Sequence, residues 1–231
     1  MTAVFITATG TDIGKTFLAT GMIRYFRDGK IPIDALKPVA TGFDDDAPEW
    51  TDTAILLSAL GKRTTPEEID RISPFRFAAP LSPDMAASRE RRKLDYGALL
   101  EFTRRAVQNH QGQLLIEGVG GIMVPLDEQH TVLDWMMAIN RPVVLVTGSY
   151  LGSISHTLTC LDVLAKRSLE VKALVVNETQ GSTVPITDTV ETMRRFARDV
   201  PVFAMPRLAP GITEHPTFGK VCEMLLRVQT P

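Results

Sequence analysis

The sequence predicts an α/β domain of three layers, in which a mostly parallel central sheet lies between two layers of helices. Two observations favour this fold. Short, nearly continuous apolar runs recur along the chain, as in strands whose two faces are both buried. The runs alternate with longer stretches of helical character, and such alternation is typical of parallel strands joined by right-handed crossover helices.

The expected strands are, in chain order, "TAVFITA" (2–8), "IDALK" (33–37), "QLLIEG" (113–118), "RPVVLVTG" (141–148), "VKALVVNE" (171–178) and "VPVFAMP" (200–206). The expected helices that alternate with them are 15–28, 52–60, 95–111, 131–139, 153–167, 185–198 and 216–227. Two charged runs, "DDD" (44–46) and "RERRK" (89–93), are expected to be solvated loops. We find no repeat or linker, so the sequence predicts one domain over residues 1–231.

Composition narrows the function classes. The 231 residues are 44% hydrophobic and 23% charged, as in a globular protein, and the net charge of −2 gives no reason to expect nucleic acid or an anionic membrane as a partner. No apolar stretch reaches the roughly 18 residues of a membrane span, and no basic region precedes the first apolar run, so a cytoplasmic protein is expected. Cys160 and Cys222 are expected to be reduced core thiols, and Trp50 and Trp135 core side chains.

Polar residues gather where the expected strands end. Because ligands of parallel sheets bind at the carboxyl ends of the strands, these positions are the candidate site. They are Thr7 to Thr16 after the first strand, Lys37, Glu117, Gly148 to His156, and Asn177.

The first of these segments ends as a phosphate-binding loop does. Gly14, Lys15 and Thr16 lie between a buried strand and a helix, where backbone N–H groups and the helix dipole hold phosphate oxygens. Lys15 would reach the β- and γ-phosphates, and the Thr16 hydroxyl would bind Mg²⁺. The common pattern has glycine where this chain has Thr9, so a chance Gly-Lys-Thr in a turn is the alternative.

Four motifs together resemble the dethiobiotin synthetase family, which uses ATP in biotin synthesis. They are "TATGTDIGKT", "KPVATG", "IEGVGG" and "VVNE". The resemblance implies a P-loop NTPase-like domain with the fold described above. The chain departs from the family loop at Ala8, where the family has glycine, and at Gly10, where it has aspartate. We expect Gly10 to supply the backbone freedom that position 8 gives up.

The reaction that the resemblance implies joins CO₂ to two neighbouring amines of 7,8-diaminopelargonate. In that reaction one amine becomes a carbamate, ATP phosphorylates it, and the second amine closes the ring, which would make the protein a ligase. Since the carbamate and the triphosphate repel each other, cations are needed where they meet. The resemblance assigns catalysis to Lys37, Lys15 and Thr11. Pro38 favours extended backbone at Lys37, which would direct its side chain past the strand end, and a solvent-facing lysine is the alternative.

The resemblance also implies an ATP site, a magnesium site and a substrate site. The nucleotide ligands would be Thr11, Asp12, Ile13, Gly14, Lys15, Thr16, Phe17, Asp52, Glu117, Asn177, Pro206, Arg207 and Leu208. The magnesium ligands would be Thr16, Asp52 and Glu117, and the substrate ligands Lys37, Thr41, Pro80, Gly120, Leu151, Gly152, Ser153 and Ser155. Three simpler roles stay open: Thr51 or Asp52 as a helix N-cap, Glu117 as a cap of the next segment, and Asn177 as a turn residue.

One segment implies a second copy of the chain. "GSYLGSISHTL" resembles the family loop that reaches across a two-fold axis, where N–H groups at the helix start near 153 would bind the distal carboxylate of the substrate. The expected assembly is therefore a homodimer whose sites use both subunits. Ser155 stands where many relatives have asparagine, and an ordinary helix start is the alternative. Asn177 is expected to pair bidentately with the adenine edge, and "PRLAPG" (206–211) to complete the base pocket.

Two other functions fit a loop of this kind. A partition-type regulatory ATPase of the same P-loop branch would have an extra lysine early in the loop, as in K-G-G-x-G-K-T, and no lysine precedes Lys15 here. An ATP-dependent enzyme that amidates a tetrapyrrole would be longer and have a glutaminase domain with a nucleophilic cysteine. The sequence therefore favours dethiobiotin synthesis.

Overall fold

The computed structural model describes residues 2–197 and 199–227, and a six-stranded parallel sheet forms its centre. The sheet confirms the predicted fold class, and its strand order is β2-β5-β1-β6-β7-β8. Its strands are β1 (Thr2–Ala8), β2 (Ile33–Leu36), β5 (Gln113–Glu117), β6 (Val143–Gly148), β7 (Val171–Asn177) and β8 (Val202–Met205). Each matches a predicted strand within two residues at either end, because strands buried on both faces give long apolar runs.

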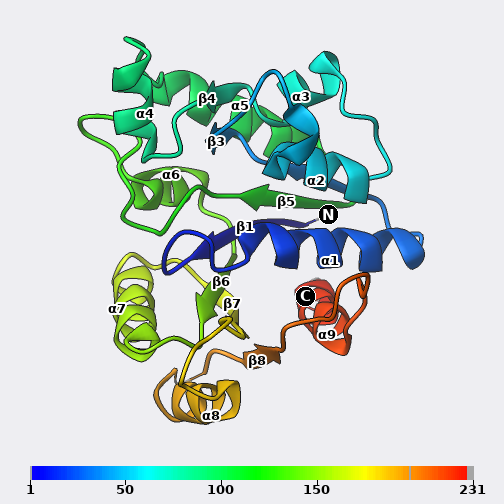
Figure 1. Cartoon of the computed structure of the whole chain (residues 1–231), viewed down its shortest axis with the longest axis vertical. Helices are drawn as coiled ribbons and strands as arrows, with labels where there is room; N and C mark the ends of the chain where they lie inside the picture. The colour runs from blue at the N-terminus through cyan, green and yellow to red at the C-terminus, as the bar shows by residue number, and fades with distance from the viewer. Residues whose placement is uncertain (1, 198, 228–231) are drawn as a thin grey trace.

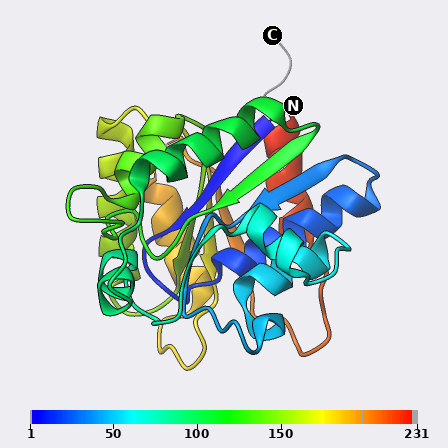
Figure 2. The ribbon, with the colours of Figure 1, turned by 90° about the horizontal axis from the view of Figure 1, so that it is seen from above.

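Helices cover both faces of the sheet. They are α1 (Lys15–Asp28), α2 (Asp52–Ala59), α3 (Pro66–Ile72), α4 (Pro83–Arg89), α5 (Tyr96–Asn109), α6 (Val132–Ile139), α7 (Ser153–Lys166), α8 (Ile186–Phe196), α9 (Pro216–Arg227) and a 3-10 turn at Pro48–Trp50. Figure 1 shows α1 running along β1, and Figure 2 shows α1 and α9 on one side of the sheet with α5 and α7 on the other. No helix of the described residues has both the length and the apolar character needed to cross a membrane.

The sequence prediction missed the small structures between β2 and α5. Strands β3 (Val39–Thr41) and β4 (Phe75–Phe77) form a separate two-stranded parallel sheet, with α3 and α4 beside it in the upper part of Figure 1. Strands of three residues are too short to show a pattern. The two helices did carry a signal, since each begins with a hydroxyl residue followed by proline, which is typical of a helix start.

The core lies between the sheet and its helices. Trp135 is fully buried and meets Phe5 edge to face, with ring centroids 4.7 Å apart. The prediction for Trp50 was wrong, because its side chain is 82% exposed at the end of the 3-10 turn, whose described residues include no buried one. Cys160 and Cys222 are buried free thiols, as predicted, and burial raises the pKa of Cys160 to about 11.

Strand β1 lies at the position where the strand order reverses. Residues 113–117 of β5 pair with one edge of β1, and residues 143–146 of β6 pair with the other. The loops that follow β1, β5 and β6 therefore leave the same edge of the sheet side by side. This edge is where an open parallel sheet binds its ligands.

Candidate active site

The loop between β1 and α1 exposes helix N–H groups to the site. Asp12 and Gly14 adopt left-handed backbone conformations, with φ of 56° and 94°, and α1 begins at the next residue with no side-chain cap. A glycine is needed at position 14 for a second reason, because a Cβ there would lie 2.2 Å from Nδ2 of Asn177. The uncapped amides and the helix dipole make this turn suitable for a phosphate group.

The expectation for Gly10 was wrong. Gly10 does not have a positive φ, and a Cβ built there would meet nothing within 4 Å, so this backbone does not require glycine. The left-handed turns lie later, at Asp12 and Gly14. Ala8 fits because it is simply the last residue of β1 and is fully buried.

Lys15 lies over the loop from the first turn of α1. Its side-chain Nζ donates to the carbonyl oxygen of Gly10 at 3.0 Å, and the residue is 7% exposed. Burial, and secondarily the nearby charge of Lys37, lowers the pKa of Lys15 from 10.5 to about 8. Lys15 forms no ion pair with a carboxylate of the described residues, so its ammonium group can pair with a bound anion.

Lys37 is held by two carboxylates at the end of β2. Its Nζ lies 2.5 Å from Oε1 of Glu117 and 2.8 Å from Oδ2 of Asp52, and Lys37 and Glu117 are both at least 95% buried. Burial disfavours the ammonium form, but the two carboxylates outweigh it, so the pKa of Lys37 is raised above its usual value. Lys37 therefore stays charged and does not face solvent.

Thr16, Asp52 and Glu117 meet around this ammonium group. The Thr16 hydroxyl donates to Oε1 of Glu117 at 2.6 Å, and Oε2 of Glu117 is buried with no hydrogen-bond partner among the described residues. Thr51 is the N-cap of α2, since its Oγ1 accepts from the N–H of Ala54 at 3.3 Å, and Asp52 in the next position keeps its carboxylate for the site. The pKa of Asp52 is lowered, because Lys37 outweighs the effect of burial.

These three oxygen ligands fit a magnesium ion. Mg²⁺ is usually bound by one or two carboxylates together with phosphate oxygens and water. The buried lone pairs of Oε2 of Glu117 are available to coordinate such an ion. No cluster of three or more His, Cys, Asp or Glu side chains that would hold a metal ion occurs in the described part of the chain.

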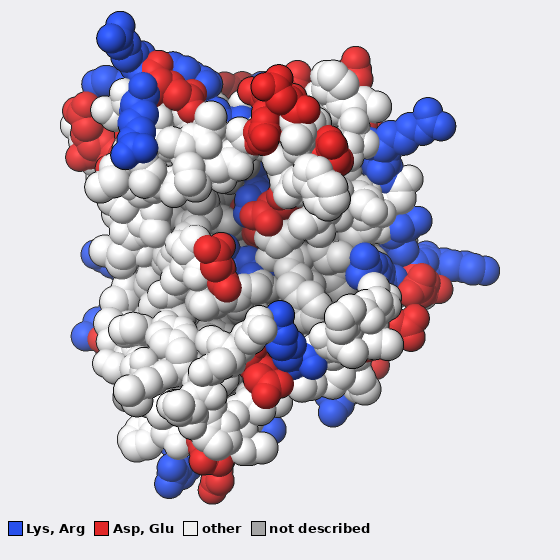
Figure 3. Space-filling view, in the orientation of Figure 1, with Lys and Arg blue, Asp and Glu red and all other residues white. Residues whose placement is uncertain are grey.

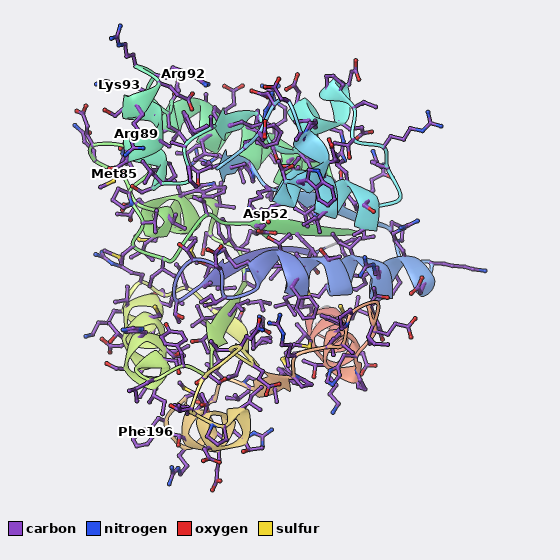
Figure 4. The ribbon with its side chains drawn as sticks, viewed as in Figure 1. Asp52, Met85, Arg89, Arg92, Lys93 and Phe196 are labelled. Carbon is purple, nitrogen blue, oxygen red and sulfur yellow. The ribbon has the colours of Figure 1, made fainter. Side chains whose placement is uncertain are left out.

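Lys15, Lys37 and Asp52 line one cavity of about 540 Å³, and Glu117 lies behind Lys37 without lining it. Figure 3 shows this hollow at the centre of the face, with acidic and basic atoms inside it, and Figure 4 shows Asp52 between α2 and α1. The predicted residues that line it are Thr11, Asp12, Gly14, Lys15, Thr16, Lys37, Thr41, Asp52, Pro80 and Gly120. Four further lining residues were not predicted, namely Leu81, Ser82, Val119 and Val124. Ser82 before Pro83 had the helix-start signal described above, while the three apolar residues had none.

The remaining predicted substrate residues lie elsewhere. Leu151 and Gly152 come directly before α7, Ser153 and Ser155 lie in its first turn, and none of the four lines the cavity. Leu151 is 86% exposed, and α7, like α1, follows a left-handed glycine (Gly152, φ 96°) without a side-chain cap. This helix start can therefore bind an anion, but within one chain it does not contribute to the cavity.

The part of the site expected to bind the adenine base differs from the expectation in one respect, the contact made by Asn177. Nδ2 of Asn177 donates to the carbonyl oxygen of Ile13 at 2.7 Å, so the amide holds the phosphate loop and cannot pair bidentately with adenine in this arrangement. Its Oδ1 is buried with no partner among the described residues, which leaves one contact available. Pro206, Arg207 and Leu208 follow β8, and the N–H of Arg207 donates to Glu178 at 2.8 Å. Phe17 packs edge to face on Phe218, with centroids 5.5 Å apart.

A larger cavity of about 930 Å³ lies between α4 and residues 126–129. Its wall includes Met85, Arg89, Arg92 and Lys93, which Figure 4 labels at the upper left. Arg92 is paired with Glu90 at 2.8 Å and Lys93 with Glu128 at 3.0 Å. The smaller cavity is the better candidate for an active site, because the two buried lysines, Asp52 and the phosphate loop line it.

Known proteins resemble this chain along most of its length. A family model described as an AAA domain matches residues 2–210. The chain is 46% identical over 206 residues to an ATP-dependent dethiobiotin synthetase from Acidiphilium cryptum, covering 88% of this chain and 92% of that one. It is 44% identical over 209 residues to the enzyme of that name from Phenylobacterium zucineum, covering 90% and 89%.

Solved structures with the same fold are more distant in sequence. The cell division protein MinD of Aquifex aeolicus has a TM-score of 0.54 and 12% identity, covering 100% of this chain and 99% of that one. The cell division ATPase MinD of Pyrococcus furiosus has a TM-score of 0.53 and 16% identity, covering 99% and 100%. At these identities the likeness concerns the fold alone.

Proposed function

The chain belongs to the dethiobiotin synthetase family, and from this premise we propose that it joins CO₂ to 7,8-diaminopelargonate at the expense of ATP. The products are dethiobiotin, ADP and phosphate, and the route passes through a carbamate and a carbamic–phosphoric anhydride. The observation that carries this proposal is the meeting of two buried lysines, Lys15 and Lys37, in one cavity beside a phosphate loop.

The ammonium groups of Lys15 and Lys37 offset the electrostatic repulsion between the two reacting groups. A carbamate anion has to approach the terminal phosphoryl group of a triphosphate, and the two repel each other. Lys15 and the uncapped amides of α1 hold the phosphate oxygens, while Lys37 at the end of β2 faces the carbamate. Because both lysines are at least 93% buried, their charges act more strongly than they would in bulk solvent.

Thr16, Asp52 and Glu117 are the proposed magnesium ligands. When bound, the ion neutralises charge on the phosphate oxygens as the phosphoryl group is transferred. The carboxylates of Asp52 and Glu117 also hold Lys37 in position in the described structure. Thr11, Thr41, Pro80 and Gly120 form part of the remaining wall, which would orient the diamine.

The far end of the substrate requires a second copy of the chain. We infer a homodimer in which the start of α7 from one subunit completes the cavity of the other. Two features support this: the α7 start has uncapped N–H groups suited to a carboxylate, and the neighbouring Leu151 is 86% exposed in the single chain. Asn177 and residues 206–208 are the proposed base pocket, and the cytoplasm, which supplies ATP, is the proposed location.

The direct test is product formation. Mixing the protein with diaminopelargonate, bicarbonate and Mg-ATP is expected to yield dethiobiotin, detected by mass spectrometry. Reactions without the diamine or without ATP are the controls. Absence of dethiobiotin with an intact, folded protein would refute the proposed function.

Nucleotide binding is expected to take up a proton near pH 8. The pKa of Lys15 is about 8 in the free protein, so this group is about half protonated there, and a bound triphosphate favours its charged form. Uptake of about half a proton at pH 8, and of almost none near pH 6.5, should therefore accompany binding. Above pH 8 the affinity should fall as pH rises.

Calorimetry in two buffers with different ionisation enthalpies measures this uptake directly. The Lys15→Ala variant is the control, and the uptake should disappear in it. Equal heats in both buffers at pH 8 for the unaltered protein would contradict the assignment of Lys15 to the phosphates.

A further inference from the structure

A line of hydroxyl groups joins the phosphate loop to the start of α7. Oγ1 of Thr9 lies 3.0 Å from Oγ1 of Thr147, which lies 2.8 Å from Oγ1 of Thr157. The Thr157 hydroxyl donates to the carbonyl oxygen of Ser153 at 2.6 Å. The line begins one residue after β1 and ends at the first residue of α7.

The direction of these hydrogen bonds is fixed by counting protons, since each hydroxyl donates only one. Thr157 uses its proton on Ser153, so Thr147 must donate to Thr157. Thr147 has then used its own proton, so Thr9 must donate to Thr147. Thr147 is the central member, because it accepts from the loop and donates to the helix.

The fold explains why the three threonines meet. Ala8 of β1 and Val146 of β6 are the last paired residues of these neighbouring parallel strands, so Thr9 and Thr147 come next on each strand, side by side. Thr157 is one helical turn beyond Ser153. Thr147 and Thr157 are both fully buried, so solvent water does not replace a lost hydroxyl there.

We propose that Thr147 is a positioning residue, which sets the phosphate loop and the start of α7 at a fixed spacing. This inference rests on the proposed function, in which the loop holds ATP and the start of α7 holds the carboxylate of the diamine in the partner's site. Thr147 touches neither ligand and acts through Thr9 and Thr157.

The chain contains a matched control. Thr103 is also fully buried and also makes two hydrogen bonds, accepting from Nε1 of Trp135 at 3.2 Å and donating to the carbonyl oxygen of Leu99 at 2.8 Å. It lies in α5, and neither it nor its partners line the cavity. Thr147→Val and Thr103→Val therefore remove the same chemical group from equally buried positions.

The test compares these variants by calorimetry with the β,γ-imido analogue of Mg-ATP and by steady-state kinetics with the diamine. For Thr147→Val we expect the Kd of the analogue and the KM of the diamine each to rise about fivefold, as for one neutral hydrogen bond. Thr147→Ser should restore both values. Thr103→Val should lower the Tm about as much as Thr147→Val does. It should leave the Kd of the analogue and the KM of the diamine unchanged.

Thr157→Val gives a second test that does not require Thr147→Val to fold. It cuts only the link to α7, so the KM of the diamine should rise while the Kd of the analogue stays the same. Unchanged constants in Thr147→Val, no rescue by serine, or equal shifts in Thr103→Val would overturn the inference. If the unaltered chain makes no dethiobiotin, the proposed function fails, and the Kd comparison of Thr147→Val with Thr103→Val still decides whether Thr147 positions the loop.

Discussion

Replacing Lys37 by methionine is expected to lower kcat for dethiobiotin formation by about 100- to 1000-fold, the range seen when one charge-stabilising donor is removed from an active site. The ammonium group of Lys37 is the cation that would offset the carbamate charge, and methionine keeps the length of the side chain without that charge. Binding of Mg-ATP should change little, because Lys15 and the amides of α1 remain. Quench-flow and calorimetry measure the two effects. Turnover equal to that of the unaltered protein would remove Lys37 from its proposed role.

The same variant should also be less stable, and this effect is measured separately from catalysis. Glu117 is 1% exposed and would lose the partner that lies 2.5 Å from its carboxylate. Leaving one charge of such a pair buried costs about 3 kcal/mol of unfolding free energy. Adding Glu117→Gln, which removes the unpaired charge, should recover most of this loss in urea unfolding. Because Glu117 is also a proposed magnesium ligand, turnover is compared in the single Lys37→Met variant, at a temperature where circular dichroism shows it folded. A loss of turnover no larger than the unfolded fraction of that variant would show that the defect was one of folding.

Replacing Lys15 by alanine is expected to weaken Mg-ATP binding about 100-fold, the size of a strong hydrogen bond between charged groups. Lys15 is 93% buried at the cavity, and its single described hydrogen bond is to the carbonyl oxygen of Gly10. Its charge therefore has no other strong local use in the loop. Equilibrium dialysis or calorimetry measures the loss.

Lys220→Ala is the matched control for this prediction. Lys220 is exposed on α9, so its removal changes the net charge equally without touching the cavity. Its Mg-ATP affinity should equal that of the unaltered protein. If Lys15→Ala and Lys220→Ala had the same affinity, the triphosphate would have to bind elsewhere.

The parts of the site that follow long buried strands could be predicted from the sequence. Lys37 and Glu117 end apolar runs, and Gly14, Lys15 and Thr16 follow another, so parallel pairing brings them to one edge. This logic needs only the period of the apolar residues and the direction of the strands. For that reason the central sheet and the two lysines of the site could be predicted from the sequence.

Other parts depended on contacts that no local pattern encodes. β3 and β4 are strands because they pair with each other, and Val119 and Val124 line the cavity through the path of the loop after β5. The amide of Asn177 turned out to bind the Ile13 carbonyl, which depends on the conformation of the phosphate loop. Trp50 is exposed although tryptophan is highly buried on average, and nothing in the structure explains this exposure.

The central position of β1 has a consequence for synthesis of the chain on the ribosome. Strand β1 has no pairing strand until β5 at residues 113–117 and β6 at 143–148 emerge. At roughly 5–20 residues per second, that delay is on the order of 10 s. During it β1 exposes "AVFI" without a pairing strand, so chaperone capture of this segment should peak before residue 148 is released and end soon afterwards.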